Sequence, residues 1–238
     1  MGWGTSRTAT AVYALLRDID RRLHARAIDV PPDAFLLGQP RHALIEALCR
    51  GVLARVAAVD WGTFQAIAPS LSAFGLDGYR TAVALSLGQA VDSQVTAEFM
   101  DVVDRPPAGS LLYRRVTRPT RGHVLFRSQM LLLAEGEFAV APLEMTGLLQ
   151  HHTPAAVRAI LHARLLKHRA DLDSTARTLL LFHTARYLGR LLPEIEAGHL
   201  ARGLLRLAYY RVHHRAIARP AFERLRIVDF GARRSVVP

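Results

Sequence analysis

Apolar residues recur every three to four positions over most of the chain, which is the spacing of one buried stripe on an α-helix. Residues 8–27 show this spacing most clearly, and their stripe comprises Val12, Leu15, Leu16, Ile19 and Leu23. The same spacing predicts helices over 41–59, 63–74 and 79–103. The first half of the chain is therefore expected to be helical.

Helices are also predicted in the C-terminal part, where the sequence marks two of their starts. Thr153 is a good N-cap, and Pro154 then occupies the first helical position. A second start lies at Asp173–Ser174, and that helix should run to Leu192. A final helix is predicted over 193–216.

The stretch before these C-terminal helices has a different pattern. Three short apolar segments, 111–116, 123–132 and 138–140, are separated by the turn-like residues 119–122 and 135–137. This spacing is typical of short strands joined by turns, although the leucines at 131–133 fit a helix equally well. We expect a mainly α-helical, multi-helix globular protein with a small β-meander or hairpin at residues 111–141.

The clearest break in the chain is the Arg-Pro-Pro-Ala-Gly segment at residues 105–109. Prolines restrict the backbone and interrupt helices, so the segment is a candidate linker. It would join a helical N-terminal part, 1–104, to a C-terminal part, 110–238, that holds the β element and further helices. The alternative is that the two parts form one continuous domain.

The charge of the chain changes sign at the same point. The formal net charge of the whole protein is +11 at pH 7. Residues 1–104 contain nine arginines and eleven acidic residues, whereas residues 105–238 contain twenty-two basic and nine acidic residues. A single lysine among thirty-one basic residues indicates a GC-rich genome, but codon bias acts on a whole gene and cannot create this contrast. An anionic partner for the second part is the usual reason.

Two groups of basic residues are candidate binding sites, and the first lies on the helix predicted over 193–216. Its members fall within roughly 100° of a helical wheel, and they are His199, Arg202, Arg206, Tyr209, Tyr210 and His213. Arginine binds phosphates and carboxylates in bidentate geometry, and tyrosine rings stack on bases or pack in protein interfaces. A solvated polar face whose tyrosines pack on a neighbouring element explains the same pattern.

The second group consists of Arg114, Arg115, Arg118 and Arg121, which surround a turn of the predicted β element. No acidic residue lies between positions 105 and 135. Four guanidinium groups so close together repel one another unless acids or an anionic ligand screen them. We therefore expect either an anion-binding loop or an exposed loop that is screened by salt.

Motifs for catalysis or metal binding are incomplete in this sequence. Glu196 and His199 have the spacing found in di-iron bundles, but the second copy that such sites need is missing. Asp101 and Asp104 could hold Mg²⁺, although a single such pair is more often solvated. Cys49 is the only cysteine, which excludes an internal disulfide and a cysteine-based zinc site. We predict no metal, no cofactor and no catalytic residue, and favour a non-enzymatic role.

The longest apolar runs are far shorter than the roughly 20 residues that cross a bilayer, and the N-terminus lacks the pattern of a signal peptide. We expect a soluble, intracellular protein, cytoplasmic or, in a eukaryotic or virus-infected cell, nuclear. Gly2 and Ser6 match the minimal myristoylation pattern. The bulky Trp3 argues against such a membrane tether.

The basic C-terminal half and the incomplete catalytic motifs favour a non-enzymatic adaptor or assembly protein. Its Arg- and His-rich half would dock an acidic protein surface. A nucleic-acid-binding protein that uses the same basic surface is the first alternative. A helical enzyme with an unrecognised site is the second. The sequence does not indicate an oligomeric state.

Overall fold

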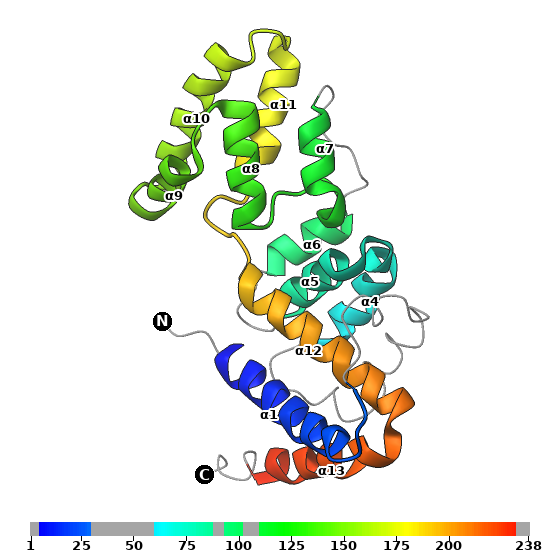
Figure 1. Cartoon of the computed structure of the whole chain (residues 1–238). Coiled ribbons are helices and arrows are strands. Elements are labelled where there is room, and N and C mark those ends of the chain that lie inside the picture. Colours follow the sequence, from blue (N-terminus) through cyan, green and yellow to red (C-terminus); the bar gives the residue numbers. More distant parts are fainter. Residues whose placement is uncertain (1–4, 30–59, 88–92, 102–109, 232–238) are drawn as a thin grey trace, which may run out of the picture. The chain divides into compact units, whose positions relative to one another are not determined.

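The computed structural model describes residues 5–29, 60–87, 93–101 and 110–231, which are mainly α-helical (Figure 1). This confirms the predicted fold class. Contacts divide the chain into two compact units, which we call unit 1 (1–91 with 195–238) and unit 2 (92–194). The division differs from the boundary that the sequence favours, and the predicted linker at 105–109 lies outside the described residues.

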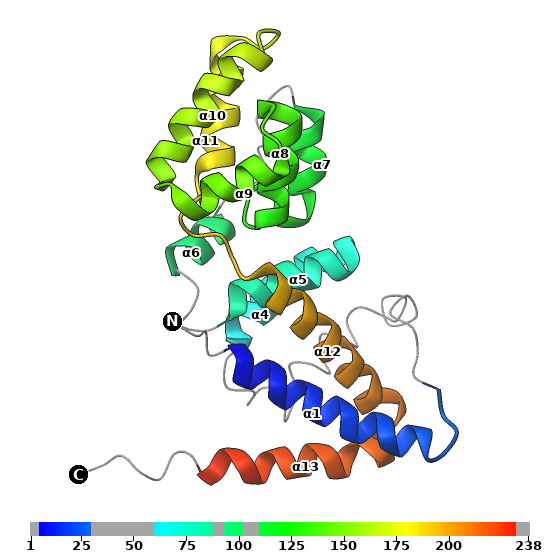
Figure 2. The same ribbon diagram turned by 60° about the vertical axis from the view of Figure 1, so that its left-hand side comes forward.

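Unit 1 joins helices from both ends of the chain (Figures 1 and 2). Its helices are α1 (Thr5–His24), α4 (Trp61–Leu71), α5 (Gly75–Ser86), α12 (Glu194–His213) and α13 (Arg215–Gly231), with a 3₁₀ turn, η2 (Ser72–Phe74), between α4 and α5. The apolar stripe predicted for the first helix is buried along its whole length. The helix predicted over 41–59 lies outside the described residues.

Helix α12 lies alongside α1, and the two run in the same direction. The Tyr13 hydroxyl, near the middle of α1, donates to the carbonyl of His199 in the second turn of α12 at 3.1 Å. One turn further along α12, a Cβ at Gly203 would lie 2.8 Å from Cγ1 of Val12 on α1. Glycine at this position lets the two helices approach closely, which brings the apolar side of α12 onto the α1 stripe.

The α4–α5 pair forms the other part of unit 1. Asp60 caps α4 by accepting from the backbone N–H of Gly62 at 3.0 Å and of Thr63 at 3.4 Å. A hydrogen bond from the Thr63 hydroxyl is the main cause that lowers the pKa of this carboxyl. The helices then meet so closely that a Cβ at Gly78 would lie 1.9 Å from the backbone oxygen of Leu71.

The sequence predicted one helix over 79–103, and this is wrong because the structure has two separate helices there. Helix α5 ends at Ser86, whose carbonyl accepts from the backbone N–H of Asp60 at 2.6 Å. A second helix, α6 (Ser93–Asp101), follows after residues 88–92, which lie outside the described part. Apolar residues four positions apart along this stretch are nevertheless buried, at Val83, Leu87, Val95 and Phe99.

Unit 2 is a bundle in which α8 is central. It comprises α6, α7 (Leu111–Thr117), the 3₁₀ turn η4 (Arg118–Thr120), α8 (Arg127–Phe138), α9 (Pro142–His151), α10 (Pro154–His168) and α11 (Ser174–Ala185). Helix α8 contacts α7, α9 and α10, and its buried side includes Met130, Leu133 and Phe138. Thr153 and Asp173 cap α10 and α11 as predicted.

The β element predicted over 111–141 is wrong, since α7, η4 and α8 occupy this stretch and the described residues contain no strand. Ser110 starts α7 as an N-cap by accepting from the backbone N–H of Tyr113 at 2.9 Å. The expected turn at 135–137 is the last part of α8. A Cβ at Gly136, in this last part of α8, would lie 2.2 Å from the Cδ2 atom of Leu112 on α7. The glycine marks close packing between two helices and not a turn.

Among the residues that the structure describes, no helix combines the length and the apolar character needed to cross a bilayer.

We expect Gly78→Ala to destabilise unit 1 by about 1–3 kcal/mol, because the added Cβ collides with backbone atoms at the end of α4. Gly198→Ala is the matched control in α12, where the nearest atom, Cδ of Arg80, would be 3.5 Å from the new Cβ. The control should be neutral or more stable, since alanine favours helix formation by up to about 1 kcal/mol over glycine. Urea unfolding followed by circular dichroism measures both changes. Equal stability of the two variants would contradict the close approach.

Candidate binding surfaces

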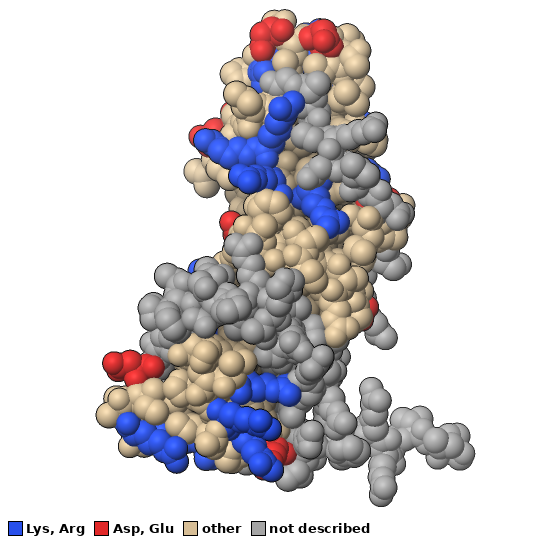
Figure 3. All heavy atoms as spheres, turned by 90° about the vertical axis from the view of Figure 1, so that its right-hand side faces the viewer, with Lys and Arg blue, Asp and Glu red and all other residues tan. Residues whose placement is uncertain are grey.

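Helix α7 and turn η4 present exposed arginines on one side. Arg114, Arg115 and Arg118 are all exposed, and their spacing of three and four residues places them on one face. In Figure 3, basic side chains gather over the part of unit 2 that carries α7. We call these three residues, together with Arg121, the α7 arginines. The sequence predicted this group as a loop, and the structure places most of it on a helix.

Arg121 differs from the other α7 arginines. It follows η4 with a left-handed backbone, φ 50°, and its side chain is half-buried. Its guanidinium carbon lies 5.3 Å from the centre of the Phe99 ring on α6, which is a cation–π distance. Arg121 therefore contributes to the packing of α6 as well as to the charge of this surface.

The opposite side of α7 holds the helix on unit 2. Tyr113 and Thr117 are fully buried, and the Tyr113 hydroxyl donates to the carbonyl of Gly122 at 2.6 Å. Burial raises the pKa of this phenol far above its usual value. Because the buried side is fixed, the arginines are held on the outside.

The C-terminal end of α7 is fixed by Gln129, a buried residue of α8. Its side-chain oxygen accepts from the backbone N–H of Leu125 at 2.9 Å and of Phe126 at 3.1 Å. Its side-chain nitrogen donates to the carbonyl of Val116 at 3.0 Å and to the hydroxyl of Thr120 at 2.8 Å. One amide thereby joins the end of α7, turn η4 and the start of α8.

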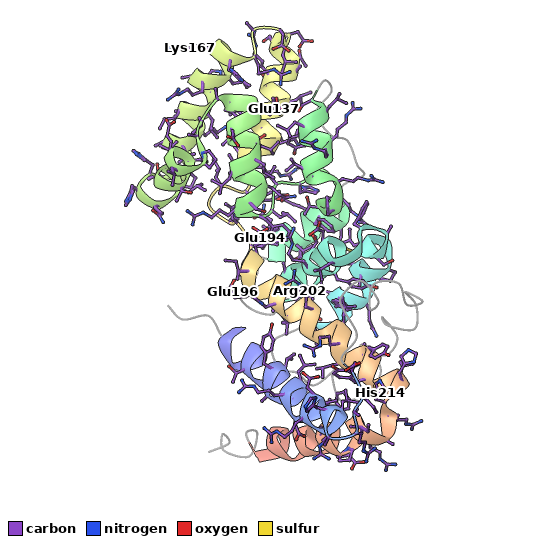
Figure 4. All side chains as sticks on the ribbon, in the orientation of Figure 1. Glu137, Lys167, Glu194, Glu196, Arg202 and His214 are labelled. Carbon is purple, nitrogen blue, oxygen red and sulfur yellow. The ribbon has the colours of Figure 1, made fainter. Side chains whose placement is uncertain are left out.

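The N-terminal end of α7 is fixed by Glu137, which lies near the end of α8 (Figure 4). This carboxylate is buried, accepts a hydrogen bond from the Ser110 hydroxyl and forms an ion pair with Arg169. Arg169 also binds Asp171 through two hydrogen bonds of 2.9 and 3.0 Å. Ser110 thus links the first turn of α7 to a charged network that reaches the end of α10.

The second predicted surface lies on α12 in unit 1, and the structure divides its residues into two sets. His199, Arg202 and His213 are exposed, and Figure 4 shows Arg202 partway along α12. Tyr209 is half-buried, with its ring centre 4.5 Å from that of His213. These four residues remain on the outer side of the helix.

Arg206 and Tyr210 instead face α1. The Arg206 guanidinium binds both carboxylate oxygens of Asp20, at 2.9 and 3.0 Å. The Tyr210 hydroxyl donates to the same carboxylate at 2.6 Å, and the tyrosine is fully buried. Burial, with this hydrogen bond, raises the pKa of Tyr210 to about 12. Both side chains hold α12 on α1, and their geometry is that of a structural contact.

A polar group that the sequence analysis missed lies between α6 and the end of α11. The Tyr187 hydroxyl donates to Glu98 at 2.8 Å and lies 3.4 Å from Nδ1 of the buried His123. Arg186 forms an ion pair with Glu98 at 2.7 Å. The sequence gives little signal for this group, since Glu98 and Tyr187 are 89 positions apart. The only hint is that His123 opens the apolar run 123–126.

The surroundings of His123 keep its ring neutral. Burial is the largest cause, and Arg186 and His183 add to it, so that the pKa of His123 falls to about 4. Arg121 acts in the same direction, while Glu98 acts in the opposite one. The Nε2 atom of His123 is buried and has no hydrogen-bond partner. A charged His123 is therefore poorly accommodated in folded unit 2.

The candidate metal ligands do not gather in the described residues. No group of three or more His, Cys, Asp or Glu is placed to hold an ion there. Glu196 and His199 are both exposed on α12. Asp104 and Cys49 lie outside the described part of the chain.

We expect Arg206→Ala to lower the free energy of unfolding of unit 1 by about 1 kcal/mol, because Asp20 loses a half-buried, doubly hydrogen-bonded partner. Arg202→Ala on the same helix should change it by less than about 0.5 kcal/mol, since that side chain is exposed. Thermal or urea unfolding distinguishes the two. A free energy of unfolding that Arg206→Ala leaves unchanged would show that the contact with α1 contributes no stability.

His123 should make the stability of unit 2 depend on pH. Its pKa rises from about 4 in the folded protein to its ordinary 6.5 on unfolding, so the unfolded chain binds the extra proton between these values. The free energy of unfolding should fall by about 2 kcal/mol between pH 7 and pH 5. Urea titrations at several pH values measure this slope.

The control for this slope is the exposed His152. His123→Gln should flatten the pH dependence between pH 7 and pH 5, whatever its effect on stability at pH 7. His152→Gln should retain the slope of the natural protein. A slope that survives His123→Gln would assign the effect to another group.

Comparison with known proteins gives no match. No protein-family model, no curated protein and no solved structure is similar to this chain at the level that shows a relationship. The function proposed below therefore rests on the geometry and charge of these surfaces.

Proposed function

We propose that the protein is a non-enzymatic binding protein, an adaptor or assembly component, whose α7 arginines dock an acidic surface of a partner protein. One observation carries this proposal. Arg114, Arg115 and Arg118 are exposed on one face of a helix whose opposite side and both ends are fixed.

The charges on this face favour a carboxylate-rich partner. Three guanidinium groups on two turns of helix repel one another, and bound carboxylates would relieve that repulsion. Arginine also forms paired, charge-assisted hydrogen bonds with carboxylates. Positions 106–134 of the sequence contain no acidic residue, so the local charge of this stretch is positive.

The fixed position of α7 also favours binding. An interface that is already ordered loses little conformational freedom when a partner docks, so more of the contact energy appears as affinity. Gln129 and Glu137 supply this order from the buried side of α7. Long arginine side chains still lose rotamer freedom, which limits the gain to a modest value per contact.

The α12 surface is the weaker candidate for the same role. Arg206 and Tyr210 bind Asp20 of α1, so two of its six predicted members are part of the packing of unit 1. His199, Arg202 and His213 remain exposed. We therefore assign the docking role to the α7 arginines.

The experiment compares two variants that each remove two positive charges from unit 2. Arg114→Gln with Arg115→Gln removes them from α7, and Arg158→Gln with Lys167→Gln removes them from exposed positions on α10. The probe is a fluorescein-labelled glutamate-rich peptide, whose binding is measured by anisotropy at low and at physiological salt. The α7 variant should bind roughly tenfold more weakly, from about 0.7 kcal/mol per lost ion pair. The α10 variant should bind within about twofold of the natural protein.

Nucleic acid is the competing occupant and is tested in parallel. Labelled duplex and single-stranded DNA are titrated at the same salt concentrations, because generic basic charge attracts any polyanion. DNA bound more tightly than the peptide at physiological salt would favour a nucleic-acid-binding protein. If neither the peptide nor DNA binds at low salt, the docking role of α7 fails.

A further inference from the structure

The exposed face of α7 contains a large apolar side chain as well as its arginines. Leu111, the first residue of the helix, has 80 % of its surface exposed. It lies three, four and seven positions before Arg114, Arg115 and Arg118. At 100° per residue, these four side chains fall within a sector of roughly 100°. We call this set the α7 stripe.

The α7 stripe is apolar at one end and positively charged along the rest of its length. A single exposed leucine is ordinary on a protein surface. Here, however, the leucine stands at one end of a run of guanidinium groups, whose methylene stems are themselves apolar. The stripe extends for about 10 Å, from 1.5 Å per residue over seven residues. It therefore offers an apolar contact followed by cations over two helical turns.

We infer that the partner segment docking on α7 is an acidic amphipathic helix, with one apolar side chain packed on Leu111 and carboxylates on the arginines. This inference rests on the function proposed above. Carboxylates three and four residues apart lie on one face of a helix, as the arginines of α7 do. A partner helix of two turns thus matches the α7 stripe in length and in the spacing of its charges.

Leu111 also favours a protein over a nucleic acid on this surface. A phosphate placed against the leucine would lose water and gain no hydrogen bond, which costs free energy. An aliphatic side chain of a partner gains from the same contact, because both apolar surfaces are removed from water. The arginines attract both occupants, so Leu111 is the residue that distinguishes them.

The test uses the full-length protein and two labelled helical peptides. Both peptides carry three glutamates at positions spaced by three and four residues, and one adds a leucine on the same face where the other has serine. The natural protein should bind the leucine peptide roughly five- to tenfold more tightly, equivalent to about 1–1.4 kcal/mol. Equal affinity for the two peptides would overturn the inference.

Three variants assign this preference to the α7 stripe. Leu111→Ser should abolish the preference for the leucine peptide and leave the affinity for the serine peptide unchanged. Leu143→Ser is the matched control, since Leu143 is 87 % exposed near the start of α9 in the same unit, and it should keep the preference. Arg114→Gln with Arg115→Gln should weaken the binding of both peptides and keep their ratio.

The outcomes separate this inference from the proposed function. Binding of both peptides with no effect of Leu111→Ser keeps the docking role of the arginines and rejects the apolar anchor. Failure of both peptides to bind at low salt rejects the docking role itself. Displacement of the leucine peptide by single-stranded DNA at an equal concentration would assign the α7 stripe to nucleic acid and overturn the inference.

Discussion

Two buried polar side chains of helix α8 form hydrogen bonds with the two ends of α7. The position of the exposed arginines on unit 2 depends on these hydrogen bonds. Glu137 binds Ser110 before the first turn of α7, and Gln129 binds Val116 in its last turn. The two residues are eight positions apart on α8, about 12 Å, which suits two antiparallel helices of this length. Each unpaired buried group would cost about 1–3 kcal/mol. Helix α7 therefore cannot slide or rotate without a large loss, and this fixes the arginines outward.

Arginines on amphipathic helices have two different roles in this protein. Arg206 lies at the edge of the buried side of α12, where Asp20 of α1 accepts two hydrogen bonds from its guanidinium. Arg114 and Arg115 lie opposite the buried Tyr113 and Thr117, beyond the reach of that core. The first kind of arginine stabilises a helix pair, and the second gives a surface its charge. A helical wheel shows both kinds as basic residues on one side of a helix.

The two units change the meaning of the charge contrast along the chain. Residues 195–238 carry much of the excess positive charge, and they belong to unit 1 with residues 1–91. Unit 1 contains eighteen basic and ten acidic residues, and unit 2 contains thirteen and ten. The more basic unit is thus not the one with the stronger candidate surface. The positions of a few exposed arginines are therefore a better argument for a binding surface than the net charge of a unit.

The sequence by itself determined the helical class, the buried stripe of α1 and the starts of α10 and α11, because helix periodicity and N-caps are local properties. It also marked every member of the α7 arginines. Only the tertiary structure decided that residues 111–138 form two helices. In the sequence Gly136 looks like a turn residue, whereas in the structure it is a helical residue packed against the side chain of Leu112. The same holds for Arg206, Tyr210 and the Glu98–Tyr187–His123 group, whose partners lie far away in the sequence. Long-range pairing depends on how helices pack, and no local pattern encodes it.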